Sequence, residues 1–462
     1  MTRRVVIVGG GFAGVSAAQE LAKRLRRQGR LGGQRDADPA GSVEVLLLNR
    51  DNYFVFQPLL ADIISGTIET THVVVPLRRM LPGVDVEVGI VERLDTVARQ
   101  VHLRRRVSGE AVTVTYEALV LATGSVTDFS AVPGMAEHAL GVRTLGDAFY
   151  LRNRALDMLE EARMEADPAR RARFLTFVVV GGGSTGVEVA AELHDLLHLA
   201  VRSFRGVDLR PRVVLVHGHA LLLPALGDRL GRYTTRKMRQ SGIELRLQRR
   251  LTQVLPDRVE LDDGEIIETA TVVSTVGNAP PPLLADLPTP HDRRGWITPD
   301  ATFAVPGLER VWALGDCASI RDPRTERPMP ATAQHAVREG PHAARNVLAA
   351  LDGRPQVPFD YGQLGMLVSL GRFKGAGEVL GFKVSGFIAW FMWRSYYLLR
   401  LPSWDRRVRV ALDWTLELLL KRDIVEISVR RTRTRPGEEP GELPGEPVSA
   451  GARPDAEDEL TL

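Results

Sequence analysis

VVIVGGGFAG, residues 5–14, is the stretch of sequence that predicts the fold. Its first four residues are β-branched, as in a buried parallel strand, and Gly9, Gly11 and Gly14 follow at G-x-G-x-x-G spacing. Gly9 allows a sharp turn, Gly11 lets the backbone approach a pyrophosphate, and Gly14 lets the next helix pack against the strand. The positive end of that helix then faces the phosphates. We therefore predict a strand, a tight turn and a helix that bind a dinucleotide.

The same pattern recurs in the middle of the chain. The apolar run 177–180 leads into Gly181, Gly183 and Gly186. Each copy is followed by a second matching block, VLATG at 120–124 and VSTVG at 273–277. One glycine-rich turn also closes ordinary βα units, so two unrelated α/β domains are the alternative. The repetition favours an α/β fold with two Rossmann-like dinucleotide-binding domains.

Composition excludes several classes of protein. The chain has 462 residues and a net charge of +3, and no basic, aromatic stretch lies near a recognisable nucleic-acid motif, so we expect two or three domains and no nucleic-acid partner. Cys317 is the only cysteine, which rules out an intrachain disulfide and a dithiol mechanism. The N-terminal apolar run is too short for a signal peptide, and no run reaches the ~20 residues of a spanning helix. We expect a cytoplasmic protein.

Three further segments have patterns that predict local structure but not a definite role. Residues 53–60, YFVFQPLL, suit either core packing or the lining of a planar ring. Alternating residues at 84–91, 97–101 and 112–116 predict a small antiparallel sheet. The Arg/Glu-rich helix expected within 126–175 has the composition of a solvated face.

The ends of two strands bear on cofactor choice. An acid usually contacts the ribose hydroxyls there, but Asn49 and His217 occupy these positions. Asn49 still offers an acceptor and a donor. His217, with His219 and Arg212 nearby, tolerates a 2′-phosphate, so the choice between NADH and NADPH stays open.

A third strand end precedes an alanine-rich helix. Gly315-Asp316 places a carboxylate at the edge of the sheet where cofactors bind. The helix, expected to begin near Thr332, directs its dipole at an anion, and a reduced flavin is a natural partner. His335 on this helix is either a satisfied polar residue or a proton donor.

The C-terminal part is aromatic and basic. Four of the six tryptophans lie between Lys383 and Ile427, and apolar residues recur at helical spacing from 408 to 420 (Val410, Ala411, Trp414, Leu418). This pattern is typical of a helix at a bilayer interface attracted to anionic lipid. A packing or dimer helix is the alternative. Residues 431–462 are expected to be disordered.

Together these motifs resemble those of type II NADH dehydrogenases, which are non-proton-pumping NADH:quinone oxidoreductases with a pyridine nucleotide-disulfide reductase-like fold. The selective matches are Phe56 to Leu60, Leu121 to Ser125, Gly315-Asp316, Ala333-Gln334 and Val410 to Trp414. The resemblance covers residues 3–427. It implies an FAD-binding domain (1–125 and 286–365), an NAD(P)H-binding domain (126–285) and a C-terminal membrane-associating or dimerisation region (366–430).

The resemblance also implies roles for individual residues. Glu188 and Gln334 would be catalytic, near the nicotinamide and the quinone. The FAD site would comprise Gly9, Gly11, Phe12, Ala13, Gly14, Asn49, Arg50, Gln57, Thr123, Gly124, Asp316, Ala333 and Gln334. The NAD(P)H site would comprise Gly181, Gly183, Ser184, Thr185, Gly186, Glu188, His217 and Gly277. No metal site is expected.

It further implies a membrane quinone, menaquinone or ubiquinone, as acceptor for a peripheral homodimer at the cytoplasmic face of an anionic membrane. Arg338 stands where the family often has a second glutamine, so the identity of the quinone stays open. Two other functions remain as alternatives: a soluble reductase of a ferredoxin-like protein, and a flavin-bearing binding protein switched by reduction. Sulfide:quinone chemistry is disfavoured because a second cysteine is missing.

Overall fold

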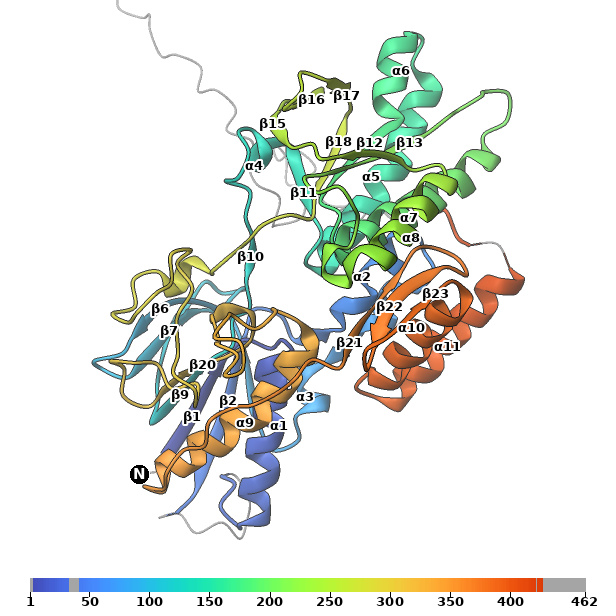
Figure 1. Cartoon of the computed structure of the whole chain (residues 1–462). Coiled ribbons are helices and arrows are strands. Elements are labelled where there is room, and N and C mark those ends of the chain that lie inside the picture. The colour runs from blue at the N-terminus through green and yellow to red at the C-terminus, as the bar shows by residue number, and fades with distance from the viewer. Residues whose placement is uncertain (1–2, 33–40, 421, 427–462) are drawn as a thin grey trace, which may run out of the picture.

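The structure is a computed structural model that describes residues 3–32, 41–420 and 422–426. Figure 1 shows two α/β units, joined by thin connections, with a C-terminal group of strands and helices beside them. The tail predicted to be disordered, 431–462, lies outside the described residues.

The first unit is built on a five-stranded parallel sheet of order β20-β9-β1-β2-β5. Its strands are β1 (Arg3–Val8), β2 (Val43–Asn49), β5 (Asp85–Val88), β9 (Ala118–Leu121) and β20 (Val311–Ala313). Helices α1 (Phe12–Arg27) and α9 (Ala333–Leu351) pack against each other closely. A Cβ atom on Gly340 of α9 would lie 2.6 Å from the carbonyl oxygen of Ala13. Glycine is therefore needed where the two helices cross.

A three-stranded antiparallel sheet shares a hydrophobic core with this parallel sheet. It comprises β6 (Ile90–Asp95), β7 (Gln100–Arg104) and β8 (Ala111–Thr115). The predicted antiparallel sheet is present, but only the end of the segment 84–91 belongs to it, because β5 continues the parallel ladder and the Gly89 N–H donates to the Asn49 carbonyl at 2.9 Å. The segment 97–101 also differs, since Val97 lies in an exposed turn.

The second unit repeats the first. Its parallel sheet has the order β11-β18-β12-β13-β14. The strands are β11 (Ala139–Gly141), β12 (Thr176–Val180), β13 (Arg212–His217), β14 (Glu244–Leu247) and β18 (Thr271–Ser274). An antiparallel sheet of β15 (Leu251–Val254), β16 (Arg258–Leu261) and β17 (Ile266–Glu268) shares a second core with it. The internal repeat predicted from the two glycine motifs is confirmed.

Helices α5 (Leu145–Met164), α7 (Ser184–Ala200) and α8 (Gly227–Gln240) complete this unit. The prediction that the helix within 126–175 is a solvated face is wrong for α5, which buries eight residues. Its alanines and leucines recur on one face and pack into the main core. The many charged residues on the other face made this apolar stripe hard to recognise in the sequence. Even Arg152 is buried, and it donates to the Asp423 carbonyl at 2.6 Å.

Short elements connect these layers. The two units are joined by an antiparallel pair, β10 (Val126–Thr127) and β19 (Asn278–Ala279). A second pair is β3 (Tyr53–Val55) with β4 (Val74–Pro76). The remaining short helices are α2 (Leu60–Ile64), α3 (Leu77–Met80), α4 (Met135–His138) and α6 (Pro168–Phe174). The 3-10 turns are η1 (Gln57–Leu59), η2 (Thr70–Val73), η3 (Val201–Ser203), η4 (Pro224–Leu226), η5 (Pro282–Leu284) and η6 (Gly315–Cys317).

The C-terminal group contains an antiparallel sheet and two helices. The strands are β21 (Gly365–Ser369), β22 (Gly375–Val379) and β23 (Phe382–Ser385), and the helices are α10 (Phe387–Arg400) and α11 (Trp404–Leu419). Figure 1 shows α10 and α11 at the periphery of the molecule. In the described part of the chain, every helix is too short or too polar to cross a bilayer.

The apolar face expected on α11 is not the exposed one. Val410 and Trp414 are buried against the protein, which corrects their assignment to a lipid-facing stripe. A second stripe, four residues apart along the helix, is exposed instead. It consists of Trp404, Val408, Leu412 and Leu416, and α10 adds Phe387, Ile388 and Phe391.

Candidate functional site

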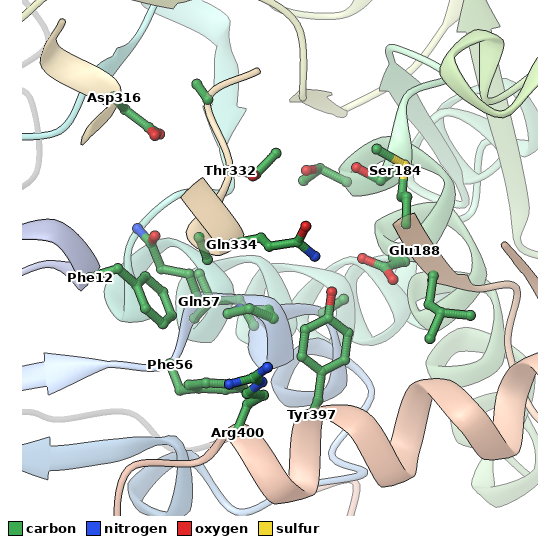
Figure 2. A pocket seen from close by; sticks show the side chains of 18 of the residues that line it. Phe12, Phe56, Gln57, Ser184, Glu188, Asp316, Thr332, Gln334, Tyr397 and Arg400 are labelled. Carbon is green, nitrogen blue, oxygen red and sulfur yellow. The ribbon is translucent and has the colours of Figure 1, made fainter. Parts of the chain in front are cut away.

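A cavity of about 820 Å³ lies where the two units and the C-terminal group meet. The first turns of α1 and α7 both reach it, through Phe12 and Ser184. Figure 2 shows Gln334, Glu188 and Tyr397 pointing toward one another inside the cavity, with Phe12 and Gln57 on the side of the first unit. One space is thus accessible from both predicted nucleotide sites.

The two glycine loops have the same geometry. Gly9 and Gly181 have φ values of 112° and 114°, which side chains disfavour. A Cβ on Gly14 would overlap the carbonyl oxygen of Gly9, whereas a Cβ on Gly11 would meet nothing within 4 Å. Gly183 and Gly186 repeat this difference in the second loop. Neither α1 nor α7 has a capping side chain or an acid in its first turn, so their N–H groups suit a pyrophosphate.

The polar residues that end β2 and β13 hold these loops. Asn49 Oδ1 accepts from the Gly10 N–H at 2.8 Å, and His217 Nδ1 accepts from the Gly182 N–H at 3.1 Å. Burial, with the nearby His219, lowers the pKa of His217, which favours the neutral ring. Each side chain therefore uses one of its polar atoms to hold the neighbouring glycine loop.

Arg212 does not lie near His217, contrary to the prediction. It begins β13, whereas His217 ends that strand, and its guanidinium pairs with Glu244 at 2.7 Å. The sequence distance of five residues was misleading because an extended strand places its two ends at opposite edges of the sheet.

Glu188 is half-buried on α7 and held by the C-terminal group. Its Oε1 accepts from the Ser369 backbone N–H at 3.0 Å and from the Trp393 Nε1–H at 3.1 Å. Burial raises the pKa of Glu188 to about 8, with a further rise from Asp62, against the lowering effect of these two hydrogen bonds. The side chain that lines the cavity is therefore a carboxylic acid at neutral pH.

Gln334 is oriented by two donors. The Tyr361 hydroxyl and the Leu364 backbone N–H both donate to its Oε1 at 2.9 Å. This leaves the Gln334 amide N–H groups as donors for the cavity. Arg338, in the place of a second glutamine, stacks its guanidinium 4.3 Å from the centre of the Tyr361 ring. It also donates to the Gln334 carbonyl oxygen at 2.8 Å.

The other predicted features of α9 are confirmed. Thr332 caps the helix, and its Oγ1 lies 2.8 Å from His335 Nδ1. Burial, with the nearby Arg338, lowers the pKa of His335, which is a satisfied polar residue packed edge-on against Tyr361.

Arg143 connects the two units beside Asp316, the carboxylate predicted to lie near the flavin. Its guanidinium donates to Asp316 at 3.2 Å, to Asn278 at 2.9 Å and to Ser125. Burial raises the pKa of Asp316 while the arginine opposes this rise. Residues from β19, from η6 and from the loop just before β10 are thereby fixed around one charge.

The core-packing interpretation of residues 53–60 is confirmed, and part of the segment also lines the cavity. Phe54 is buried, and its ring lies 4.9 Å from that of Phe12 in an edge-on arrangement. Phe56 packs against Phe12 and Tyr397 at 5.7 and 6.1 Å and also lines the cavity. The aromatic segment is core on one side and cavity wall on the other.

The structure divides the predicted site residues into two groups. Those that line the cavity are Phe12, Gln57, Ser184, Thr185, Glu188, Gly277, Asp316, Ala333 and Gln334. Those outside its lining are Gly9, Gly11, Ala13, Gly14, Asn49, Arg50, Thr123, Gly124, Gly181, Gly183, Gly186 and His217. The second group forms the glycine loops and strand ends, except Arg50, which is exposed and lies 3.5 Å from Asp51.

Sequence reasoning missed four contributors to the site: Arg143, Tyr361, Ser369 and Trp393. All four donate hydrogen bonds to other side chains, and no local motif signals such long-range contacts. Only Trp393 carried a signal, because it lies in the tryptophan-rich segment.

Two glycine-loop units that open onto one cavity define a flavin- and pyridine-nucleotide-dependent oxidoreductase. The family model for pyridine nucleotide-disulphide oxidoreductases matches residues 3–340. The chain is 31% identical to the type II NADH:quinone oxidoreductase of Mycobacterium tuberculosis, over 91% of this chain and 89% of that protein. It is 30% identical to the mitochondrial internal alternative NAD(P)H-ubiquinone oxidoreductase A1 of Arabidopsis thaliana, over 92% and 86% of the two chains.

Among solved structures, NDH2 of Plasmodium falciparum in complex with NADH superposes with a TM-score of 0.80 at 17% identity. The match covers 92% of this chain and all of that chain, and it shows a common fold. This chain belongs to the pyridine nucleotide-disulphide oxidoreductase family, and within it to the type II NADH:quinone oxidoreductases.

Proposed function

We propose that this chain oxidises NAD(P)H and transfers two electrons through FAD to a quinone without pumping protons. The observation that supports this most directly is the cavity shared by the starts of α1 and α7. FAD, when bound, accepts a hydride from the nicotinamide and releases electrons to a second acceptor. The relatives named above are NADH:quinone and NAD(P)H-ubiquinone oxidoreductases, and this chain matches them over nearly their whole length.

The residues present fit both nucleotides. The open space at Gly11 and the uncapped first turn of α1 suit the FAD pyrophosphate, and Asp316 suits its ribitol. Gly183 and α7 offer the same arrangement to NAD(P)H, with Glu188 one turn further along the helix. Each nucleotide therefore has its own cradle.

Within the cavity, the chain supplies positioning and a proton. The amide of Gln334 donates hydrogen bonds toward a quinone carbonyl, because Tyr361 and Leu364 already occupy its oxygen. Glu188 holds a proton at neutral pH, which suits a reaction in which the quinone gains two protons.

We further propose that the chain binds the cytoplasmic face of an anionic membrane through α10 and α11. Ten large apolar side chains are exposed on these helices, and Arg400 and Arg409 lie among them. The cavity extends to Leu380 and Arg400, which are exposed on the same C-terminal group, and this offers a path for a lipid-soluble quinone. Pairing of two chains through these helices would cover the same surface.

The test combines an assay with vesicle flotation. Purified protein should be yellow and should reduce menaquinone and ubiquinone analogues with NADH or NADPH. Leu412→Asp with Leu416→Asp should abolish flotation with anionic vesicles, whereas Val97→Asp, at a more exposed aliphatic position in another unit, should not. Sedimentation of both variants separates membrane binding from dimerisation. Rapid NAD(P)H oxidation without quinone reduction would instead support a soluble reductase.

A further inference from the structure

The edge of the second unit where β13 ends is basic. His217 ends this strand, and Gly218 and His219 follow on an exposed loop. The two imidazole rings have centroids 5.1 Å apart. In this fold the corresponding strand end faces the adenosine ribose of the bound dinucleotide, where an acid selects a free 2′-hydroxyl. The strand end of this chain lacks that acid.

A third basic residue reaches this edge from the loop between β14 and β15. Arg250 lies along Gly218, since a Cβ placed on Gly218 would be 3.3 Å from its Nε and 3.9 Å from its Cζ. Glycine at 218 thus leaves the space that the arginine occupies. The backbone N–H of Arg249 donates to the His217 carbonyl at 3.1 Å and fixes the two loops together.

The charge of Arg250 is not neutralised by a neighbour. Arg249 is paired with Asp263, and Arg246 with Glu265 at 2.9 Å. Among the ion pairs formed by the described residues, none includes Arg250, which is exposed to solvent. Asp262 contacts it only through its backbone, whose N–H donates to the Arg250 carbonyl at 3.0 Å. The guanidinium therefore remains available for an anionic ligand.

We propose that Arg250, with His217 and His219, binds the 2′-phosphate of NADPH, so that this chain prefers NADPH to NADH. The inference rests on the proposed function, because it assigns the electron donor of the same reaction. A guanidinium binds phosphate through charge-assisted, bidentate hydrogen bonds. The exposed His219 adds a donor, and neither imidazole repels the dianion as an acid would.

Ligand binding tests this without any turnover. Calorimetry on the flavin-loaded full chain compares adenosine 2′,5′-bisphosphate with adenosine 5′-monophosphate. The bisphosphate should bind at least about tenfold more tightly. Arg250→Ala should remove this preference and leave the affinity for the monophosphate unchanged, and Arg250→Lys should keep part of it. Arg212→Ala, at the opposite end of β13, is the matched control and should behave as wild type.

Equal affinity of the wild type for both nucleotides overturns the proposal, as does a preference that survives in Arg250→Ala. Steady-state kinetics gives a second criterion, because Arg250→Ala should raise KM for NADPH about tenfold with little change in kcat or in KM for NADH. A wild type that binds the bisphosphate selectively but reduces no quinone refutes the proposed function alone. One that reduces quinones with NADH in preference to NADPH refutes this inference alone.

Discussion

Replacing Glu188 by glutamine tests the claim that the cavity stores a proton. Burial raises the pKa of this carboxyl from 4.5 to about 8. That rise corresponds to about 5 kcal/mol of preference for the neutral form. At pH 7 about nine in ten Glu188 side chains are then protonated, against fewer than about one in a hundred for an ordinary glutamate. Glutamine keeps the shape and can still accept from Ser369 and Trp393.

Infrared spectroscopy measures this proton directly. The difference between wild type and Glu188→Gln should contain the band of a protonated carboxyl, which disappears with a midpoint near pH 8. Exposed Glu160→Gln is the control and should show only a carboxylate at neutral pH. A carboxylate band from Glu188 at pH 6, or a midpoint below pH 5, would refute the reasoning.

The same proton predicts how stability depends on pH. A carboxyl whose pKa is raised on folding contributes its full stability below its unfolded pKa and loses it as pH rises through the folded pKa. Wild type should therefore lose up to about 5 kcal/mol relative to Glu188→Gln between pH 4.5 and 8. Unfolding temperatures of the two proteins should diverge over that window, and parallel curves would contradict burial of the acid.

Four further substitutions test other parts of the protein. Gly11→Val should abolish flavin binding, because its side chain fills the open space of the first glycine loop, and a yellow, fully loaded variant would show that the assignment is wrong. Gln334→Ala should impair quinone reduction more than ferricyanide reduction. Tyr361→Phe should do so about threefold to tenfold by releasing the amide oxygen, and equal losses with both acceptors would contradict this placement. Glu417→Gln should lower the free energy of unfolding by about 3 kcal/mol, because it leaves Arg394 and Arg422 poorly compensated in a buried site, and unchanged urea unfolding would exclude this.

Local patterns were sufficient to predict the repeated unit. A β-branched strand, a glycine turn and an apolar helix are encoded within about fifteen residues, and the second copy removed most of the ambiguity. The helix cap at Thr332 followed from the same kind of local signal. These predictions succeeded because the chemistry of each turn depends on its neighbours in sequence.

Other features depended on contacts between distant residues. The charged residues of α5 predicted a helix face exposed to solvent. Arg152 is buried instead, because the segment at Asp423, far along the chain, packs against it. On α11, Trp414 and Leu412 are both apolar, and only packing decides which of them is exposed. Arg250 gave no signal, because its proximity to Gly218 arises from the pairing of β13 with β14.

The anchoring of Glu188 connects the cavity to the predicted membrane surface. Both donors to its carboxyl, the Ser369 N–H and the Trp393 ring, belong to the C-terminal group. Trp393 lies on α10, the helix that also exposes Phe387 and Phe391. A displacement of α10 at a lipid surface would lengthen a hydrogen bond that favours the ionised acid, and so would raise its pKa further. The helix that is proposed to contact the membrane therefore also contributes to the proton affinity of Glu188, which burial mainly determines.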